Sequence, residues 1–197
     1  MIRVPLTSLI GFSLVFFSAP LVGSKLDLRL RMIGVLMVYI GGVLLLLRIC
    51  SLQVLSGILV SGLAGIITLS IGHIQFSEPV VIRRKGVSLI SDYLTAFALL
   101  LLAYAVERKL RQWIPVPDSL LLSALYLFFC SLKSLIASFT LTDGFIHISC
   151  ILFAFTMVYL LLETSTLVFA CLIAINLLIA FIGAYITVPE ETPEDPL

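Results

Sequence analysis

Residues 32–72 read MIGVLMVYIGGVLLLLRICSLQVLSGILVSGLAGIITLSIG, and Arg48 is the only charged residue in this stretch. A helix needs about 20 apolar residues to cross a hydrocarbon core about 30 Å thick, because each residue rises by about 1.5 Å. The stretch is therefore long enough for two crossings and must fold back on itself. Arg48, Ser51 and Gln53 are polar residues near its middle, and they predict a turn there.

The composition of the whole chain agrees with this interpretation. Of 197 residues, 61% are hydrophobic and 12% are charged, and the mean hydropathy is +1.22. Soluble domains have about 25% charged residues, so the composition excludes a soluble enzyme, a nucleic-acid-binding protein and a secreted disulfide-rich module. The net charge of +1 also gives no reason to expect nucleic acid as a partner. We expect an all-α, polytopic integral membrane protein without a soluble domain, located in the cell membrane if the source is bacterial.

The same arithmetic predicts about seven transmembrane helices. The predicted spans are residues 4–23, 32–48, 54–72, 87–106, 119–142, 145–162 and 166–188. Six spans are the alternative, if residues 4–23 are a cleaved signal peptide or one hairpin is re-entrant. Residues 189–197 are acidic and rich in proline, so we expect a disordered tail.

The distribution of Lys and Arg does not fix the orientation of these helices. With seven spans, six Lys and Arg residues lie in loops on the side of the C-terminus and five lie on the other side. The positive-inside rule needs a larger difference than this.

Four ionisable residues are candidate intramembrane groups, because a charge at membrane depth costs about 2.5–3.5 kcal/mol. Lys133 lies near the middle of the predicted span 119–142, where it forms either a structural ion pair or part of a proton or ion path. Glu163 is a possible partner, or it lies in the turn between the last two helices. Asp92 lies near the start of its helix, where the positive helix end favours an acid. Asp143 precedes Gly144, a pair typical of a loop turn.

Gly57, Ser61 and Gly65 follow one another at intervals of four residues, which predicts a helix face that packs closely against another helix. The four cysteines and two histidines lack the spacing of a metal site, and the sequence has no nucleotide-binding, zinc-protease or serine-hydrolase motif. We therefore expect no cofactor, no metal and no enzymatic activity.

Lys133, the segment Thr142-Asp143-Gly144 and Glu163 follow one another in residues 125–187, which resemble the small hydrophobic subunits of complex I and of membrane-bound hydrogenases. Those families carry a Glu-Asn-Gly motif within the membrane, whereas here the motif is Thr-Asp-Gly. The resemblance implies a proton- or ion-translocating subunit that uses Lys133 with Glu163 or Asp143. A small transporter using the same residues is a related possibility.

The residues themselves favour a different function. Short predicted loops, few buried polar groups and a small-residue helix face indicate a non-catalytic accessory or structural subunit. Its expected partners are the lipid bilayer and other membrane protein subunits.

Overall fold

The computed structural model describes residues 6–23, 28–47, 49–76, 87–113, 118–136, 141–162 and 166–186. Within these ranges all regular secondary structure is helical. The helices are α1 Leu6–Gly23, α2 Leu28–Leu46, α3 Leu52–Phe76, α4 Val87–Leu110, α5 Asp118–Ile136, α6 Leu141–Leu162 and α7 Thr166–Ile186. Seven helices without strands are therefore confirmed for the described residues.

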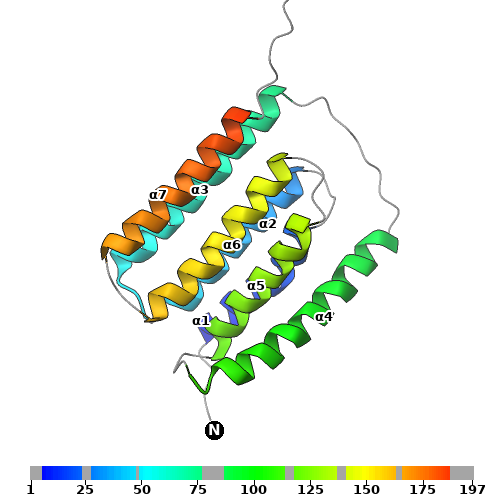
Figure 1. Cartoon of the computed structure of the whole chain (residues 1–197), viewed down its shortest axis with the longest axis vertical. Helices are drawn as coiled ribbons and strands as arrows, with labels where there is room; N and C mark the ends of the chain where they lie inside the picture. The colour runs from blue at the N-terminus through cyan, green and yellow to red at the C-terminus, as the bar shows by residue number, and fades with distance from the viewer. Residues whose placement is uncertain are drawn as a thin grey trace, which may run out of the picture.

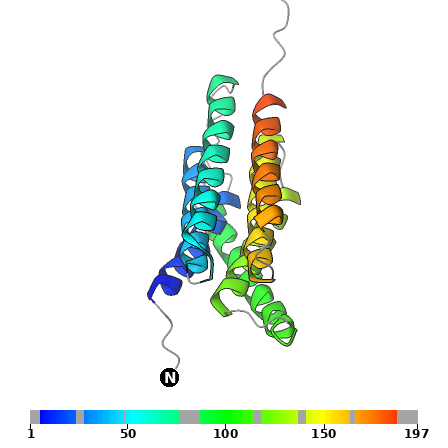
Figure 2. The same ribbon diagram turned by 90° about the vertical axis from the view of Figure 1, so that its left-hand side faces the viewer.

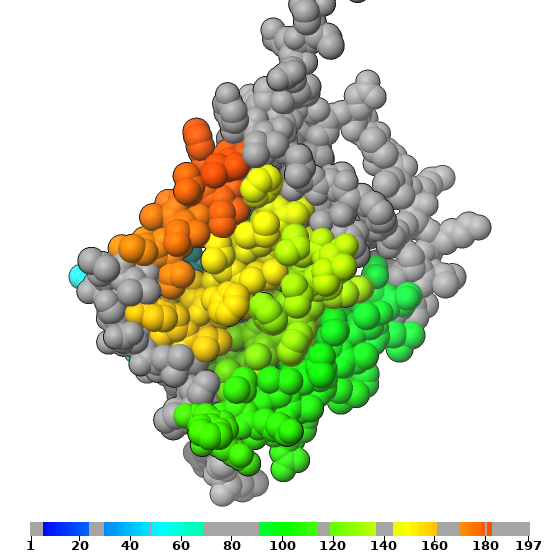
Figure 3. Space-filling model, viewed as in Figure 1, coloured from blue at the N-terminus to red at the C-terminus, as the bar shows by residue number. Residues whose placement is uncertain are grey.

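The helices form two layers, which Figure 2 shows from the edge. α1, α2 and α3 make one layer, and α5, α6 and α7 make the other, with α4 at the outer edge beside α5 (Figure 1). Successive helices run in opposite directions, and α1 packs on α5 while α3 packs on α7. The space-filling view in Figure 3 shows α7, α6, α5 and α4 side by side across one face.

The hairpin formed by α2 and α3 turns where the sequence predicts. α2 ends at Leu46 and α3 begins at Leu52, and the amides of Ile49 and Cys50 both donate to the Leu46 carbonyl. The turn satisfies a carbonyl that the helix end leaves open. Arg48 lies outside the described residues.

α1 and α2 approach each other through two glycines. A Cβ atom placed on Gly41 would lie 2.8 Å from the carbonyl oxygen of Gly11, and the reverse contact has the same distance. Side chains larger than hydrogen would therefore force the two backbones apart. Small residues at helix crossings are the usual means of close packing between membrane helices.

Pro20 lies inside α1, and α5 satisfies the carbonyl that this proline leaves open. A proline has no N–H, so the carbonyl four residues earlier, that of Phe16, loses its helical hydrogen bond. The Tyr126 hydroxyl of α5 donates to this carbonyl at 3.3 Å. The carbonyl that loses its hydrogen bond within α1 thus forms one between α1 and α5.

Two expected positions differ from the structure. α5 ends at Ile136 and not at 142, so Lys133 lies in the last turn of its helix and not near the middle. Asp143 is not in a loop, because its backbone belongs to the first turn of α6. Aspartate is favoured both in a loop turn and in the first turn of a helix. The residue type of Asp143 alone therefore does not tell these two locations apart.

Length and composition identify two of the helices as candidate membrane spans within the described residues. They are Leu6–Gly23 in α1 and Ser119–Ile136 in α5. Shorter apolar stretches occur in four others: Leu30–Leu46, Leu52–Thr68, Gly144–Leu160 and Ala170–Ile179.

Candidate functional site

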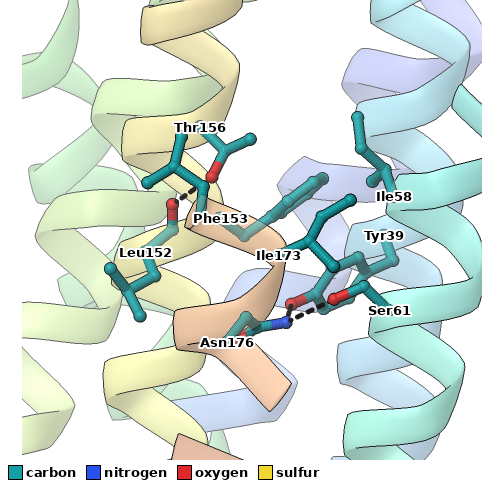
Figure 4. Close-up of a pocket in the computed structure, with 9 residues that line it drawn as sticks. Tyr39, Ile58, Ser61, Leu152, Phe153, Thr156, Ile173 and Asn176 are labelled. Atoms are coloured by element: carbon teal, nitrogen blue, oxygen red, sulfur yellow. Dashed lines mark hydrogen bonds between the residues drawn. The ribbon is translucent and has the colours of Figure 1, made fainter. Parts of the chain in front are cut away.

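A cluster of polar side chains lies inside the bundle, where α2, α3, α6 and α7 meet (Figure 4). Its centre is Asn176, which lies midway along the apolar helix α7 and is the only asparagine in the chain. Tyr39 from α2, Ser61 from α3 and Ser149 from α6 surround it, and all four side chains are buried.

Three of these residues form a closed ring of hydrogen bonds. The Ser149 hydroxyl donates to Asn176 Oδ1 at 2.6 Å, and Asn176 Nδ2 donates to the Tyr39 hydroxyl at 3.1 Å. Tyr39 Oη and Ser149 Oγ lie 3.3 Å apart. Because the single hydroxyl hydrogen of Ser149 is already used, Tyr39 must be the donor in this last bond. We call Tyr39, Ser149 and Asn176 the polar ring.

Ser61 extends the polar ring to a fourth helix. Asn176 Nδ2 also donates to Ser61 Oγ at 3.2 Å, so both amide hydrogens of Asn176 are bonded. A cavity of about 20 Å³ adjoins the polar ring, which is room for about one water molecule. Buried polar groups that are fully bonded hold their neighbours in one arrangement. The polar ring therefore fixes how the two layers face each other.

A second polar site joins α4 to α5 through an ion pair. Lys133 Nζ lies 3.7 Å from Asp92 Oδ1, and the side chains are 40% and 21% exposed. A cavity of about 10 Å³ lies beside the pair and is also lined by Pro20 and Gly23 of α1. Since Lys133 is in the last turn of α5, the pair lies at one end of the bundle.

The face of α4 that packs on the bundle has an acid near each end. Asp92 is near its start, Ala96 and Ala103 are buried in the middle, and Glu107 is buried in its last turn. Arg111 pairs with Glu107, with its Nη2 atom 2.6 Å from Oε1. The other Glu107 oxygen is buried and has no hydrogen-bond partner among the described residues.

The structure brings together two of the residues singled out in the sequence. Lys133 lies beside Asp92, whereas Glu163 is outside the described residues and only the backbone of Asp143 is described. On α3, Ser61 and Gly65 are buried and Gly57 is half-buried. This helix packs on α7, and Ser61 bonds to Asn176 there.

Sequence reasoning missed the polar ring. Tyr39, Ser149 and Asn176 are uncharged, so a search for ionisable groups in the membrane passes over them. The usable signal was a lone asparagine in a 21-residue apolar helix, since such an amide needs partners from other helices.

The described part of the chain contains no group of three His, Cys, Asp or Glu residues placed to hold a metal ion. The polar ring offers amide and hydroxyl groups, whose chemistry is hydrogen bonding between helices. Comparisons with protein-family models, with curated proteins and with solved structures find no match for this chain.

Proposed function

We propose that the chain is a multi-pass integral membrane protein that serves as a non-catalytic accessory or structural subunit of a membrane complex. Large apolar side chains on the outside of the helices support the membrane location. Val60 of α3, Leu101 of α4 and Phe181 of α7 are 65%, 55% and 65% exposed. A helix at an aqueous surface carries polar residues on its outer face, whereas lipid or a membrane partner favours apolar ones.

The observation that carries the subunit role is the interior of the bundle. The two cavities described above, of about 20 and 10 Å³, have room for about one water molecule each at most. The polar groups of the interior bond to one another across four helices, which is an arrangement suited to holding helices together.

The alternative is a proton- or ion-translocating subunit, or a small transporter, that uses Lys133 with Glu163 or Asp143. That mechanism needs an ammonium group deep in the membrane. Lys133 in the last turn of α5, beside Asp92, favours a structural pair near the membrane surface.

Purification from native membranes in a mild detergent tests the proposal. We expect the protein to stay in the membrane pellet after carbonate washing, and then to migrate on a native gel in an assembly much larger than its own 21.6 kDa. An unrelated multi-pass protein with the same tag is the control for non-specific association. If all of the protein stays in the membrane pellet but is recovered as a stable monomer, the subunit role would be contradicted and the membrane location would not.

A further inference from the structure

The last turn of α4 carries exposed positive charge. Arg108 and Lys109 are in this turn, and both are exposed. Helical hydrogen bonding continues past Leu110, because the Arg111 amide donates to the Glu107 carbonyl and the Trp113 amide to the Leu110 carbonyl. Trp113 is 84% exposed.

The three cations at this end of α4 differ in their partners. Arg111 donates from Nε and Nη2 to the buried carboxylate of Glu107, at 2.9 and 2.6 Å. Arg108 contacts the ring of Tyr104, with its guanidinium carbon 6.0 Å from the ring centre. Neither Arg108 nor Lys109 has an acidic partner among the described residues, so their charges are available to an external anion.

An apolar surface leads directly to these charges along one side of α4. Phe97, Leu101, Tyr104 and Arg108 follow at intervals of four, three and four residues, so they lie on one face of the helix. All four side chains are exposed. We call these four residues the α4 strip. Along the helix toward its C-terminal end, the side chains of the strip are first apolar, then a tyrosine and finally a cation.

The length of the α4 strip corresponds to one leaflet of a bilayer. Eleven residues separate Phe97 from Arg108, which is about 16 Å at the helical rise. Half of a hydrocarbon core about 30 Å thick is about 15 Å. Tyr and Trp residues, here Tyr104 and Trp113, are enriched where acyl chains meet headgroups.

We propose that the α4 strip and Lys109 bind an anionic phospholipid, with its acyl chain along Phe97 and Leu101 and its phosphate at Arg108 and Lys109. The inference rests on the proposed membrane location. Charge complementarity selects the lipid. Each of the two unneutralised cations should raise the affinity for an anionic headgroup by about five-fold relative to a zwitterionic one.

The single tryptophan of the chain makes the test direct, because Trp113 follows this turn. The full-length protein is reconstituted in phosphatidylcholine vesicles that contain 20% phosphatidylglycerol. In parallel samples, either the anionic or the zwitterionic lipid carries bromine on its acyl chains and quenches nearby tryptophan fluorescence. We expect brominated phosphatidylglycerol to quench Trp113 at least two-fold more than its mole fraction predicts, because even a five-fold preference would give it about half of the site.

Two variants complete the experiment. Arg108→Gln with Lys109→Gln should bring quenching by phosphatidylglycerol down to its mole fraction, and high salt should weaken the preference of the unmodified protein. Arg83→Gln with Arg84→Gln removes the same charge from the segment that precedes α4, and it should leave the preference unchanged.

The outcomes separate this inference from the proposed membrane location. Equal quenching by both brominated lipids, or a preference that survives loss of Arg108 and Lys109, would overturn the lipid site and leave the membrane location intact. An acidic protein partner would then be the candidate occupant. Absence of quenching by either lipid would overturn both proposals.

Discussion

At the scale of single residues, Asn176 is a side chain that links the two layers through hydrogen bonds. It bonds to Tyr39, Ser61 and Ser149, which lie on three other helices. Interhelical hydrogen bonds in membranes contribute about 0.6 kcal/mol on average and up to about 1.7 kcal/mol.

Replacing Asn176 by leucine removes all three bonds and should lower the free energy of unfolding by about 2 kcal/mol. Tyr39→Phe removes one hydroxyl and should have a smaller effect. Unfolding by SDS in mixed micelles measures both. Leu178→Ala, on an exposed face of α7, is the control and should change little. Equal stability of the Asn176 variant and the control would show that the polar ring does not hold the layers together.

Lys133 and Asp92 form a partly exposed pair, so their interaction should be weak. Such pairs contribute about 0.2–1 kcal/mol. Lys133→Met should therefore leave the fold intact, and Lys133→Arg should be tolerated. A double-mutant cycle with Asp92→Asn should give a coupling energy in the same range. Loss of proton translocation in vesicles by Lys133→Met, at normal abundance, would instead favour the ion-translocating alternative.

At the scale of helices, the link between Pro20 of α1 and Tyr126 of α5 can be tested by a matched pair of substitutions. Tyr126→Phe leaves the Phe16 carbonyl without its donor and should cost about 1–3 kcal/mol. In a Pro20→Ala background the new backbone N–H can bond to that carbonyl, so the same substitution should cost much less. An equal loss in both backgrounds, measured by SDS unfolding, would rule out this role for the hydroxyl.

The crossing of α1 and α2 should be sensitive to added volume. Gly41→Ala places a methyl group 2.8 Å from the Gly11 carbonyl oxygen, and backbone at that distance cannot move aside cheaply. We expect a loss of about 1–3 kcal/mol. Ala98→Val, on an exposed face of α4, adds more volume and should be nearly neutral. A neutral Gly41→Ala would mean that the two helices are farther apart than described.

The sequence predicts helices best where charges or prolines bound an apolar run. The ranges 4–23 and 166–188 have such borders, and the helices Leu6–Gly23 and Thr166–Ile186 follow them closely. The run 119–142 has no charge or proline after Lys133, so nothing in it marked the end of α5 at Ile136. Because this signal is missing, the sequence predicts Lys133 near the middle of its helix, whereas the structure has it in the last turn.

Contacts between helices could not be predicted in the same way. Tyr39 and Asn176 lie 137 residues apart, and their bond depends on which helices become neighbours. Periodicity indicates which face of a helix packs, but not against which partner. The pairing of Lys133 with Asp92 depends on the same unknown: the placement of α4 beside α5.

At the scale of the whole molecule, the alternating helices place their ends at two opposite faces. Ser51 and Gln112 lie near one end of the bundle, because α3 begins and α4 ends there (Figure 1). Ile136 lies at the other end, where α5 finishes. Val60 and Leu101 are exposed along the sides. In a membrane these sides face lipid, and in water they would face solvent.

Cysteine accessibility is the measurement that tests a membrane-spanning bundle most directly. The native cysteines are first replaced by alanine; they are Cys50, Cys130, Cys150 and Cys171. Single cysteines are then placed at positions 51, 112, 136, 60 and 101, and an impermeant maleimide is applied to sealed vesicles of each orientation. Labelling in SDS is the control that every cysteine can react.

We expect Ser51→Cys and Gln112→Cys to react from the same side of the membrane, and Ile136→Cys to react only from the other side. Val60→Cys and Leu101→Cys should react from neither side, although both side chains are more than half exposed on the protein surface. Rapid labelling of positions 60 and 101 in intact vesicles would contradict the membrane-spanning bundle, because it would show that water, and not lipid, covers the sides of the helices.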